Sequence, residues 1–307
     1  MLNVERLRVL REVVRAGSIS GAARALAYTP SAVSQQLAKL EREAGATLLV
    51  RSSRGVRPTD AGEALARRAG EILDRLADAE AEVRAVAGLP RPLRVGSFPT
   101  AGASILPPAL RTLSRTHPDV EVRVEQLDPL ESLARVAAGE LDLALLYEYD
   151  HVPLPADERV ELTPLLEEPL RVVLRADHPS ARATAVVLAD LAGETWLSSS
   201  PRSSCHPFTE RACLAAGFRP RLGIGFDDYT AMQALVAAGM GVAFAPDSGL
   251  QRPHPGVAVR PVAFQGPTRR VYAAAPAGDG PHPGREALLR GLVAAAHEGD
   301  AAVAEAT

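Results

Sequence analysis

The stretch TPSAVSQQLAKLE, residues 29–41, places small hydroxyl and amide side chains directly after a proline. Ser31, Ser34 and Gln35 stand there between evenly spaced apolar residues. A solvated helix face is usually built from Glu, Lys and Arg. An uncharged face can donate and accept hydrogen bonds, which suits contact with the polar edge of another molecule. The chemistry that these residues offer is therefore recognition through hydrogen bonds.

The apolar positions of this stretch predict a helix with one buried side. Thr29 is a good N-cap, and Pro30 fits the first helical position because its missing N–H costs nothing there. The inward residues follow the spacing i, i+4, i+7 and i+11: Val33, Leu37, Leu40 and Ala44. The opposite side of the helix carries Ser31, Ser34, Gln35, Ala38 and Arg42.

Two further helices are predicted before residue 29. The apolar period over residues 3–16 predicts an amphipathic helix that Gly17 ends, and Ser18 is a good cap for a second helix through Ala27. A helix, a short polar turn and a helix with a short-side-chain polar face are the parts of a helix-turn-helix. Ser and Gln can exchange hydrogen bonds with base edges and phosphates. The alternative is an ordinary three-helix bundle with a polar surface.

The next stretch predicts a basic β-hairpin. TLLVRSSRGVRPTDAG, residues 47–62, has two short strand-like runs around Ser-Ser-Arg-Gly. Arg51, Arg54 and Arg57 line it, as expected for a wing against phosphate or in a minor groove. Residues 1–60 hold ten basic and five acidic residues, a net charge of +5, whereas the rest holds 24 basic and 32 acidic residues, a net charge of −8. This distribution favours a winged helix-turn-helix joined to an acidic body.

Length and composition limit the class of protein. A chain of 307 residues with 47% hydrophobic content predicts two or three domains with large cores. Its apolar runs all fall short of the ~20 residues that span a bilayer. The first residues carry charges through their apolar positions, unlike a signal peptide. We therefore expect no membrane association and a cytoplasmic location.

A long connecting helix is predicted over residues 60–87, ended by Gly88-Leu89-Pro90. About 27 helical residues span about 40 Å, which is too long to be covered by the wing alone. We expect its apolar stripe to pack on a second copy of the chain, which also pairs two recognition helices for symmetric half-sites. A helix that lies on its own domain is the alternative. The stripe consists of Leu65, Ile72, Leu76, Ala79 and Val83.

From Leu93 onward, short apolar runs alternate with helical patterns, as in an α/β fold. Residues 120–147 and 220–246 both follow the order strand, acidic turn, helix, strand, and they share the string Val-Ala-Ala-Gly. Before each lies a strand that runs into a Ser/Pro-rich loop and a helix. Two similar halves in tandem predict a bilobed binding module like a periplasmic binding protein.

The cleft of such a module is the expected ligand site. Free backbone N–H groups and helix dipoles at the carboxyl ends of its strands favour carboxylates. We therefore expect a small-molecule effector, with carboxylates and amino acids as candidate classes, and no other cofactor. Each hydroxyl alone could instead be a helix cap, and Arg202 or His206 could be solvated surface residues. The candidate effector-binding residues are Ser97, Phe98, Thr100, Ala101, Tyr147, Ser199, Ser200, Arg202, Ser203, Ser204, Phe226 and Asp228.

A family resemblance extends over the run GSISGAARALAYTPSAVSQQLAKLEREAGATLLVRSSRGVRPTDAGEAL. It resembles the amino-terminal domain of LysR-type transcriptional regulators without a gap. The chain departs from the family pattern at Pro30-Ser31, where many members carry Gln-Pro, and at Gln35, where they carry Arg. The operator preference of relatives is therefore not transferred to these positions. The matching residues are Gly17-Ser18, Ala22-Ala23, Ser34, Gln36, Leu40-Glu41, Gly45, Leu48, Arg51 and Thr59 to Gly62.

The resemblance implies a sequence-specific regulator that works as a homodimer or homotetramer on double-stranded DNA, with RNA polymerase as a further candidate partner. It implies a winged helix-turn-helix, a long linker helix and a bilobed, type 2 periplasmic-binding-protein-like α/β effector domain. The expected boundaries are 1–59 for DNA binding, 60–88 for the linker, and 91–300 for the effector domain, whose first lobe takes 91–165 and 266–300 and whose second takes 166–265. The expected DNA-binding residues are Ser20, Thr29, Pro30, Ser31, Ser34, Gln35, Lys39, Arg51 and Arg54.

In that architecture two crossing strands form a hinge between the lobes. We place the crossings near residues 163–168 and 262–268. The last helix, about residues 284–297, is expected to return to the first lobe. The resemblance in this region is to the architecture and to scattered motifs, and it is weaker than at the amino terminus.

Other functions are less well supported by the residues. Cys205 and Cys213 flank the start of a predicted helix, and a peroxide-sensing branch of the family carries a cysteine pair in this region. The spacing differs and Cys213 falls on the predicted buried face, so we favour reduced thiols over redox sensing. No nucleophile elbow, phosphate loop or zinc-ligand spacing occurs, so we expect neither an enzyme nor a metal site. A small-molecule binding protein whose amino-terminal helices only dimerise it remains the alternative.

Overall fold

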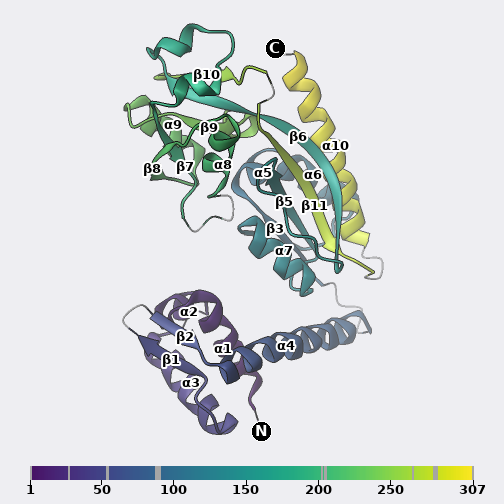
Figure 1. Cartoon of the computed structure of the whole chain (residues 1–307). Helices are drawn as coiled ribbons and strands as arrows, with labels where there is room; N and C mark the ends of the chain where they lie inside the picture. The colour runs from purple at the N-terminus through teal and green to yellow at the C-terminus, as the bar shows by residue number, and fades with distance from the viewer. Residues whose placement is uncertain are drawn as a thin grey trace. The chain divides into compact units, whose positions relative to one another are not determined.

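The computed structural model describes residues 2–26, 28–52, 55–86, 91–201, 203, 206–264, 266–278 and 283–305. The chain forms two compact units, an amino-terminal unit of residues Met1–Arg91 and a carboxyl-terminal unit of residues Pro92–Thr307. The first is built from helices and one small hairpin, and the second from a mixed sheet with helices around it (Figure 1).

The amino-terminal unit has the helices and the hairpin that its sequence predicts. Gly17 and Gly45 end two of the helices in the left-handed conformation, at φ of 61° and 67°. Ser18 accepts a hydrogen bond from the Gly21 backbone N–H, and Thr29 from that of Ala32, so both predicted caps are confirmed. The elements are α1 (Val4–Ala16), α2 (Ile19–Ala25), α3 (Pro30–Ala44), β1 (Leu49–Ser52), β2 (Gly55–Pro58) and α4 (Asp60–Val86).

The second helix is shorter than predicted. It ends at Ala25 and not at Ala27, because the backbone leaves the helical conformation at Leu26, where φ is −92° and ψ is 0°. Ala27 itself lies outside the described residues. The turn between α2 and α3 therefore begins two residues earlier than the apolar pattern indicates.

One hydrophobic core holds the first three helices together. Val33, Leu37 and Leu40 are buried, as the apolar stripe of α3 predicts, and Ala44 is half-buried beside them. The alanines of α2 allow close helix packing, since Ala22 and Ala23 are also buried. The other members of this core are Leu7, Val9, Leu10, Val13, Leu48, Ala66 and Ala69.

Polar contacts of the family-motif residues fix the hairpin on the helices. The Glu41 carboxylate accepts a hydrogen bond from the Leu48 backbone N–H at 2.8 Å. The Thr59 hydroxyl donates to the Thr47 carbonyl at 2.8 Å and accepts from the Gly62 N–H at 3.1 Å, so it caps α4 and joins it to the hairpin. These motif residues serve the fold of the unit.

The predicted connecting helix is confirmed as α4, one uninterrupted helix of 27 residues. Its first turns join the core of the unit through Ala66 and Ala69. Further along, Ile72, Leu76 and Val83 are 44%, 41% and 67% exposed. This part of the predicted apolar stripe is uncovered in the single chain. The predicted end at residues 88–90 lies outside the described residues.

The carboxyl-terminal unit is built on a sheet whose described residues form seven strands in the order β10-β6-β11-β5-β3-β4, with β9 also paired to β6. A separate parallel pair, β7 and β8, belongs to the second lobe. The strands are β3 (Leu93–Ser97), β4 (Val122–Gln126), β5 (Leu143–Tyr149), β6 (Val160–Arg175), β7 (Thr195–Ser198), β8 (Arg221–Gly225), β9 (Ala243–Pro246), β10 (Val257–Pro261) and β11 (Thr268–Pro276). The helices are α5 (Pro99–Ala103), α6 (Leu106–Thr116), α7 (Pro129–Ala137), α8 (Phe208–Ala215), α9 (Tyr229–Ala237) and α10 (Pro283–Glu305), with short 3-10 turns at Pro179–Arg182, Leu188–Leu191 and Asp247–Gly249 (η3).

Two lobes divide this unit, as the internal repeat predicts. The first lobe contains β3, β4 and β5, and the second contains β7 to β10. The repeated strand-helix-strand segments are β4-α7-β5 and β8-α9-β9. Gly139 and Gly239 follow the two helices with φ of 69° and 81°, a conformation that favours glycine, so they correspond in the two repeats.

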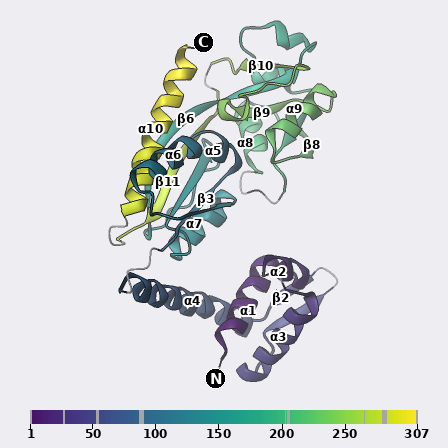
Figure 2. The same ribbon diagram turned by 180° about the vertical axis from the view of Figure 1, so that it is seen from behind.

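The lobes share β6 and are joined by two chain crossings. β6 pairs with β11 over Val160–Pro169 and with β9 and β10 from Leu170 onward. Both views show it as a long curved strand that runs from one lobe into the other (Figures 1 and 2). The chain returns between β10 and β11, so both crossings lie near the predicted places.

The last helix packs on the first lobe, which confirms its predicted return. Leu288, Leu292 and Ala296 of α10 belong to the same core as Ala109 and Leu113 of α6. The core of the second lobe surrounds the fully buried Trp196 and includes Phe208, Cys213 and Phe244. Within the described ranges, no helix is long and apolar enough to cross a membrane.

Candidate functional sites

The first turns of the outward face of α3 are uncharged and largely exposed. Ser31 and Gln35 are exposed, Ser34 is half-buried, and Lys39 is exposed one turn further on. Thr29 and Pro30 are also exposed at the start of the helix. The structure therefore brings six of the predicted DNA-binding residues together on α3 and its cap, and it places Ser20, also exposed, on α2.

The two glutamines of α3 have different surroundings. The Gln36 side chain accepts a hydrogen bond from Nε of Arg6 at 3.2 Å, and Arg6 also pairs with Glu43. This fixes α3 on α1, so Gln36 has a structural role. Gln35 is exposed. Gln36 therefore holds α3 in place, whereas Gln35 is exposed on the surface of the helix.

The hairpin predicted as a wing lies directly after α3. β1 and β2 pair antiparallel from Leu49 opposite Pro58 to Ser52 opposite Gly55. Arg57 is exposed on β2, and Arg51 belongs to β1. Arg54 lies outside the described residues. Because the hairpin is bonded to α3 through Glu41, the described strand that carries Arg57 keeps a fixed place beside the helix.

A cavity of about 270 Å³ lies between the two lobes of the carboxyl-terminal unit. Aromatic side chains from both lobes form much of its wall, together with a small set of polar groups. Such a mixture is typical of small-molecule sites. The lining residues are Phe98, Pro99, Thr100, Gln126, Leu127, Asp128, Pro129, Glu131, Tyr147, Ser199, Ser203, Phe226, Asp227, Tyr229, Met232 and Arg269.

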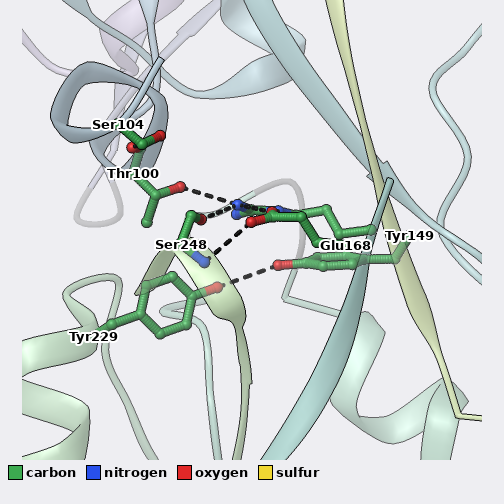
Figure 3. A network of polar contacts seen from close by, with 7 residues as sticks. Thr100, Ser104, Tyr149, Glu168, Tyr229 and Ser248 are labelled. Atoms are coloured by element: carbon green, nitrogen blue, oxygen red, sulfur yellow. Dashed lines mark hydrogen bonds and ion pairs between the residues drawn. The ribbon is translucent and has the colours of Figure 1, made fainter. Parts of the chain in front are cut away.

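Arg269, on β11, is the central polar residue of this cavity wall and is 2% exposed. Its Nε donates to Glu168 on β6 at 2.9 Å. Its Nη2 contacts Glu168 as well, and also Oγ1 of Thr100 at 3.1 Å and Oγ of Ser248 at 2.7 Å. Figure 3 shows Thr100, Glu168 and Ser248 around this point. One guanidinium is thus bonded to the hinge strand, to the first lobe and to the second lobe.

The surroundings of Arg269 keep it charged. Burial opposes its positive charge, but the attraction of Glu168 and of nearby tyrosines outweighs that cost, so the pKa of Arg269 lies above its usual value. Its guanidinium carbon lies 5.3 Å from the centre of the Phe98 ring and 5.1 Å from that of Tyr147, within the range of cation–π contacts. The buried pair is therefore an ion pair enclosed by aromatic rings.

Two tyrosines also link the lobes beside the cavity. The hydroxyls of Tyr149 on β5 and Tyr229 on α9 lie 3.4 Å apart (Figure 3). The Tyr149 ring stacks on Phe208 of the second lobe with a centroid distance of 4.0 Å. Tyr229 lines the cavity. Aromatic stacking thus joins the two lobes in addition to the Arg269 contacts.

The predicted effector-binding residues divide into three groups. The first lines the cavity: Phe98, Thr100, Tyr147, Ser199, Ser203 and Phe226. The second has other contacts: Ser97 donates to the Phe98 carbonyl, Ala101 lies in the first-lobe core, Ser200 binds Asp227, and Asp228 caps α9. Near them, the Ser104 hydroxyl donates to the Thr100 carbonyl at 2.8 Å (Figure 3). The third group, Arg202 and Ser204, lies outside the described residues.

Several residues in the cavity wall or bonded to it were not predicted. Arg269 and Glu168 lie on the two strands that join the lobes, where the sequence predicts a hinge and no site. The alternation along β11 offers one signal, because Arg269 has the same inward parity as Val271 and Ala273. The other residues missed are Pro99, Gln126, Leu127, Asp128, Pro129, Glu131 and Met232, whereas Asp227 and Tyr229 lie in the segment 226–230 that the sequence also singles out.

The described cysteine is a poor candidate for a redox switch. Cys213 is fully buried in the core of the second lobe, and burial raises the pKa of its thiol to about 12. The thiolate is the reactive form, so this thiol is held in its inert state. Cys205 lies outside the described residues. In the part of the chain that is described, no group of three metal-ligating side chains gathers.

Comparison with known proteins identifies the family. A family profile described as "Bacterial regulatory helix-turn-helix protein, lysR family" matches residues 4–63, and one described as "LysR substrate binding domain" matches residues 87–296. The chain belongs to the LysR family of transcriptional regulators. This LysR-type regulator therefore combines a DNA-binding helix-turn-helix with an effector-binding domain.

Relatives in sequence support the same family. The LysR-type regulator is 36% identical to the small neutral protease regulatory protein of Streptomyces coelicolor, over 82% of this chain and 76% of that protein. It is 32% identical to the nitrogen assimilation regulatory protein nac of Klebsiella aerogenes, over 80% and 79% of the two chains. The proteins matched are regulators and not enzymes.

Solved structures show the same fold over the full length. A Corynebacterium glutamicum OxyR C206 mutant is similar with a TM-score of 0.61 at 26% identity, covering 100% of this chain and 95% of that one. Full-length CbnR in complex with its target DNA has a TM-score of 0.61 at 22% identity, covering 96% and 100%. These likenesses extend through both units of the LysR-type regulator.

Proposed function

We propose that this LysR-type regulator reads its operator with the outer face of α3 and holds the DNA backbone with the wing. The observation that carries the proposal is the polar face of α3, on which Ser31 and Gln35 are exposed while the apolar residues of the other side lie in the core. Base edges require short donors and acceptors, whereas phosphates favour Arg and Lys. In this proposal Ser31, Ser34 and Gln35 contact bases and Arg51 and Arg54 contact phosphates. Ser20, Thr29, Pro30 and Lys39 lie at the edge of the contact.

In this proposal each segment of the chain has its own function. Residues 1–59 bind DNA, residues 60–88 form the linker, and residues 91–300 bind the effector, with lobes at 91–165 plus 266–300 and at 166–265. The exposed stripe of α4 supports a homodimer or a pair of dimers, because about two fifths or more of each of Ile72, Leu76 and Val83 is open to a partner. A regulator of transcription acts where the DNA is, so we expect a cytoplasmic location and RNA polymerase as a further partner.

The effector is assigned to the cavity between the lobes. Residues of both lobes line the cavity, and Arg269 contacts both lobes. A bound effector would therefore contact the two lobes simultaneously. A ligand that binds one arrangement of the lobes more tightly shifts the population toward it. In a dimer or tetramer, that shift would change the angle between the paired DNA-binding domains and the bend of the DNA.

The test is specific DNA binding by the full chain without any effector. Fluorescence anisotropy with a duplex from the protein's own promoter region is compared with a shuffled duplex. We expect a clear preference for the promoter duplex, and affinity that falls by about a thousandfold between about 50 and 200 mM salt as counterions are released. Equal binding to both duplexes would favour the alternative of a small-molecule binding protein whose amino-terminal helices only dimerise it.

A further inference from the structure

The amino-terminal unit contains a single aromatic residue, Tyr28, and that residue lies outside its core. No other Phe, Trp or Tyr occurs in residues 1–91. Aromatic side chains usually contribute the most buried apolar surface to a core. Tyr28 is instead 40% exposed, and it does not belong to the cluster that holds the helices together. A large part of its ring is therefore apolar surface that is open to a partner.

The position of Tyr28 places this ring at the N-terminal end of α3. Tyr28 directly precedes Thr29, the N-cap of α3. Its backbone N–H donates to the Ala23 carbonyl of α2 at 2.8 Å, so the turn between the two helices is fixed at this residue. In helix-turn-helix proteins the N-terminal residues of the recognition helix contact base edges. Tyr28 is therefore located at the end of α3 that is expected to enter the major groove.

The hydroxyl of Tyr28 is already bound within the protein. It donates to Oε1 of Glu5, in the first turn of α1, at 2.8 Å. The guanidinium of Arg8 lies 4.0 Å from the same carboxylate and neutralises it only in part. A DNA phosphate placed at this hydroxyl would meet the negative charge of Glu5, which makes a phosphate contact unfavourable. The part of Tyr28 that remains for contact with DNA is the ring.

An apolar ring can pack against few groups in the major groove. Most of the base edges there present hydrogen-bond donors and acceptors, which suit polar side chains such as those of Ser31, Ser34 and Gln35. The C5 methyl group of thymine is the apolar group that this groove presents. An exposed aromatic ring at the start of a recognition helix is complementary to that methyl group, because contact removes apolar surface of both from water.

We propose that Tyr28 is a specificity-determining residue whose ring packs against the C5 methyl group of a thymine in each operator half-site. This rests on the proposed function of α3 as the helix that reads the operator. The polar residues of α3 then read the hydrogen-bonding edges of neighbouring base pairs, and Tyr28 adds an apolar contact that they cannot make. The operator should therefore carry a thymine next to the base pairs that α3 reads.

The test removes the methyl group from the DNA and the ring from the protein. Each thymine of the promoter duplex is replaced in turn by deoxyuridine, which lacks only the C5 methyl group, and binding of the full chain is measured by fluorescence anisotropy. We expect one such replacement in each half-site to weaken wild-type binding by about fourfold, as the transfer of one methyl group out of water predicts. Tyr28→Ala should weaken binding to the unmodified duplex and reduce the effect of that replacement to less than about 1.5-fold.

Two further variants separate the ring from other effects. Tyr28→Phe keeps the ring and lacks the hydroxyl, so it should retain the deoxyuridine effect to within about twofold. Val50→Ala shortens a 53% exposed apolar side chain on β1, outside the recognition helix, and should leave the effect unchanged. Thermal unfolding followed by far-UV circular dichroism checks that the amino-terminal unit of each variant is folded.

Three results would overturn the proposal: no deoxyuridine effect in the wild type, the same effects in the wild type and in folded Tyr28→Ala, or loss of the effect in folded Tyr28→Phe. The preference of the wild type for the unmodified promoter duplex over the shuffled duplex is measured first. Failure of the proposed function would abolish that preference, whereas failure of the Tyr28 proposal leaves it intact.

Discussion

Glu168→Ala is expected to lower the free energy of unfolding of the carboxyl-terminal unit by about 3–5 kcal/mol. The substitution removes the carboxylate and leaves Arg269 charged and buried, because no other acid among the described residues contacts its guanidinium. It also frees the Ser248 N–H, which donates to Glu168 at 3.0 Å. Urea unfolding followed by Trp196 fluorescence measures the effect, since Trp196 is the only tryptophan and lies in this unit.

An exposed ion pair of the same unit gives the matched control. Arg123 and Glu121 lie 3.0 Å apart with side chains 70% and 59% exposed. Glu121→Ala should therefore change stability by no more than about 0.5 kcal/mol. The double variant Glu168→Leu with Arg269→Met should recover at least about 2 kcal/mol relative to Glu168→Ala, because it removes both charges. Equal effects of Glu168→Ala and Glu121→Ala would show that the buried pair is not as the structure describes it.

Alanine substitutions at two glycines of α4 should change the stability of the amino-terminal unit in opposite directions. A Cβ at Gly62 would lie 1.9 Å from the Leu48 carbonyl oxygen and 2.9 Å from its carbon, so the hairpin must move away. We expect Gly62→Ala to destabilise the amino-terminal unit by about 3 kcal/mol. A Cβ at Gly70 meets nothing within 4 Å in the described structure, and Gly70→Ala should stabilise the helix by up to about 1 kcal/mol.

Thermal unfolding followed by far-UV circular dichroism measures both variants. The transition seen by circular dichroism and not by Trp196 belongs to the amino-terminal unit, because Trp196 lies in the other unit. Gly62→Ala should also reduce DNA affinity, since it loosens the hairpin that Glu41 and Thr59 hold beside α3. Effects of the same sign at the two glycines would contradict the close packing of α4 on the hairpin.

The sequence predicts the amino-terminal unit well because its signals are local. The cap at Thr29 acts on Ala32, three residues away, and the buried side of α3 follows one helical period. The internal repeat likewise predicts both strand-helix-strand segments, since each is a contiguous run of fewer than thirty residues. Local hydrogen bonding and apolar spacing are enough to specify such elements.

The cavity could be predicted only in part because its polar centre is assembled from distant residues. Arg269 meets Glu168 across 101 residues and Thr100 across 169 residues of sequence. No spacing rule connects such positions. Hydroxyl and acidic residues near helix starts predict effector contacts. In the structure, however, Asp228 caps a helix and Ser200 is hydrogen-bonded to Asp227. The same residue types serve caps and ligand sites, so sequence alone cannot separate the two roles.

The most direct test of the central claim is the ratio of affinities for the promoter duplex and the shuffled duplex, measured for Gln35→Ala and Arg57→Ala. Both side chains are exposed on the amino-terminal unit, one on α3 and one on the wing. If α3 reads bases, Gln35→Ala should lower the ratio by about tenfold or more and leave the salt dependence unchanged. Arg57→Ala should weaken binding to both duplexes alike. It should also reduce, by about one, the slope of the logarithm of the binding constant against the logarithm of the salt concentration. An unchanged ratio in Gln35→Ala, with a folded protein, would contradict the claim that the uncharged face of α3 recognises the operator.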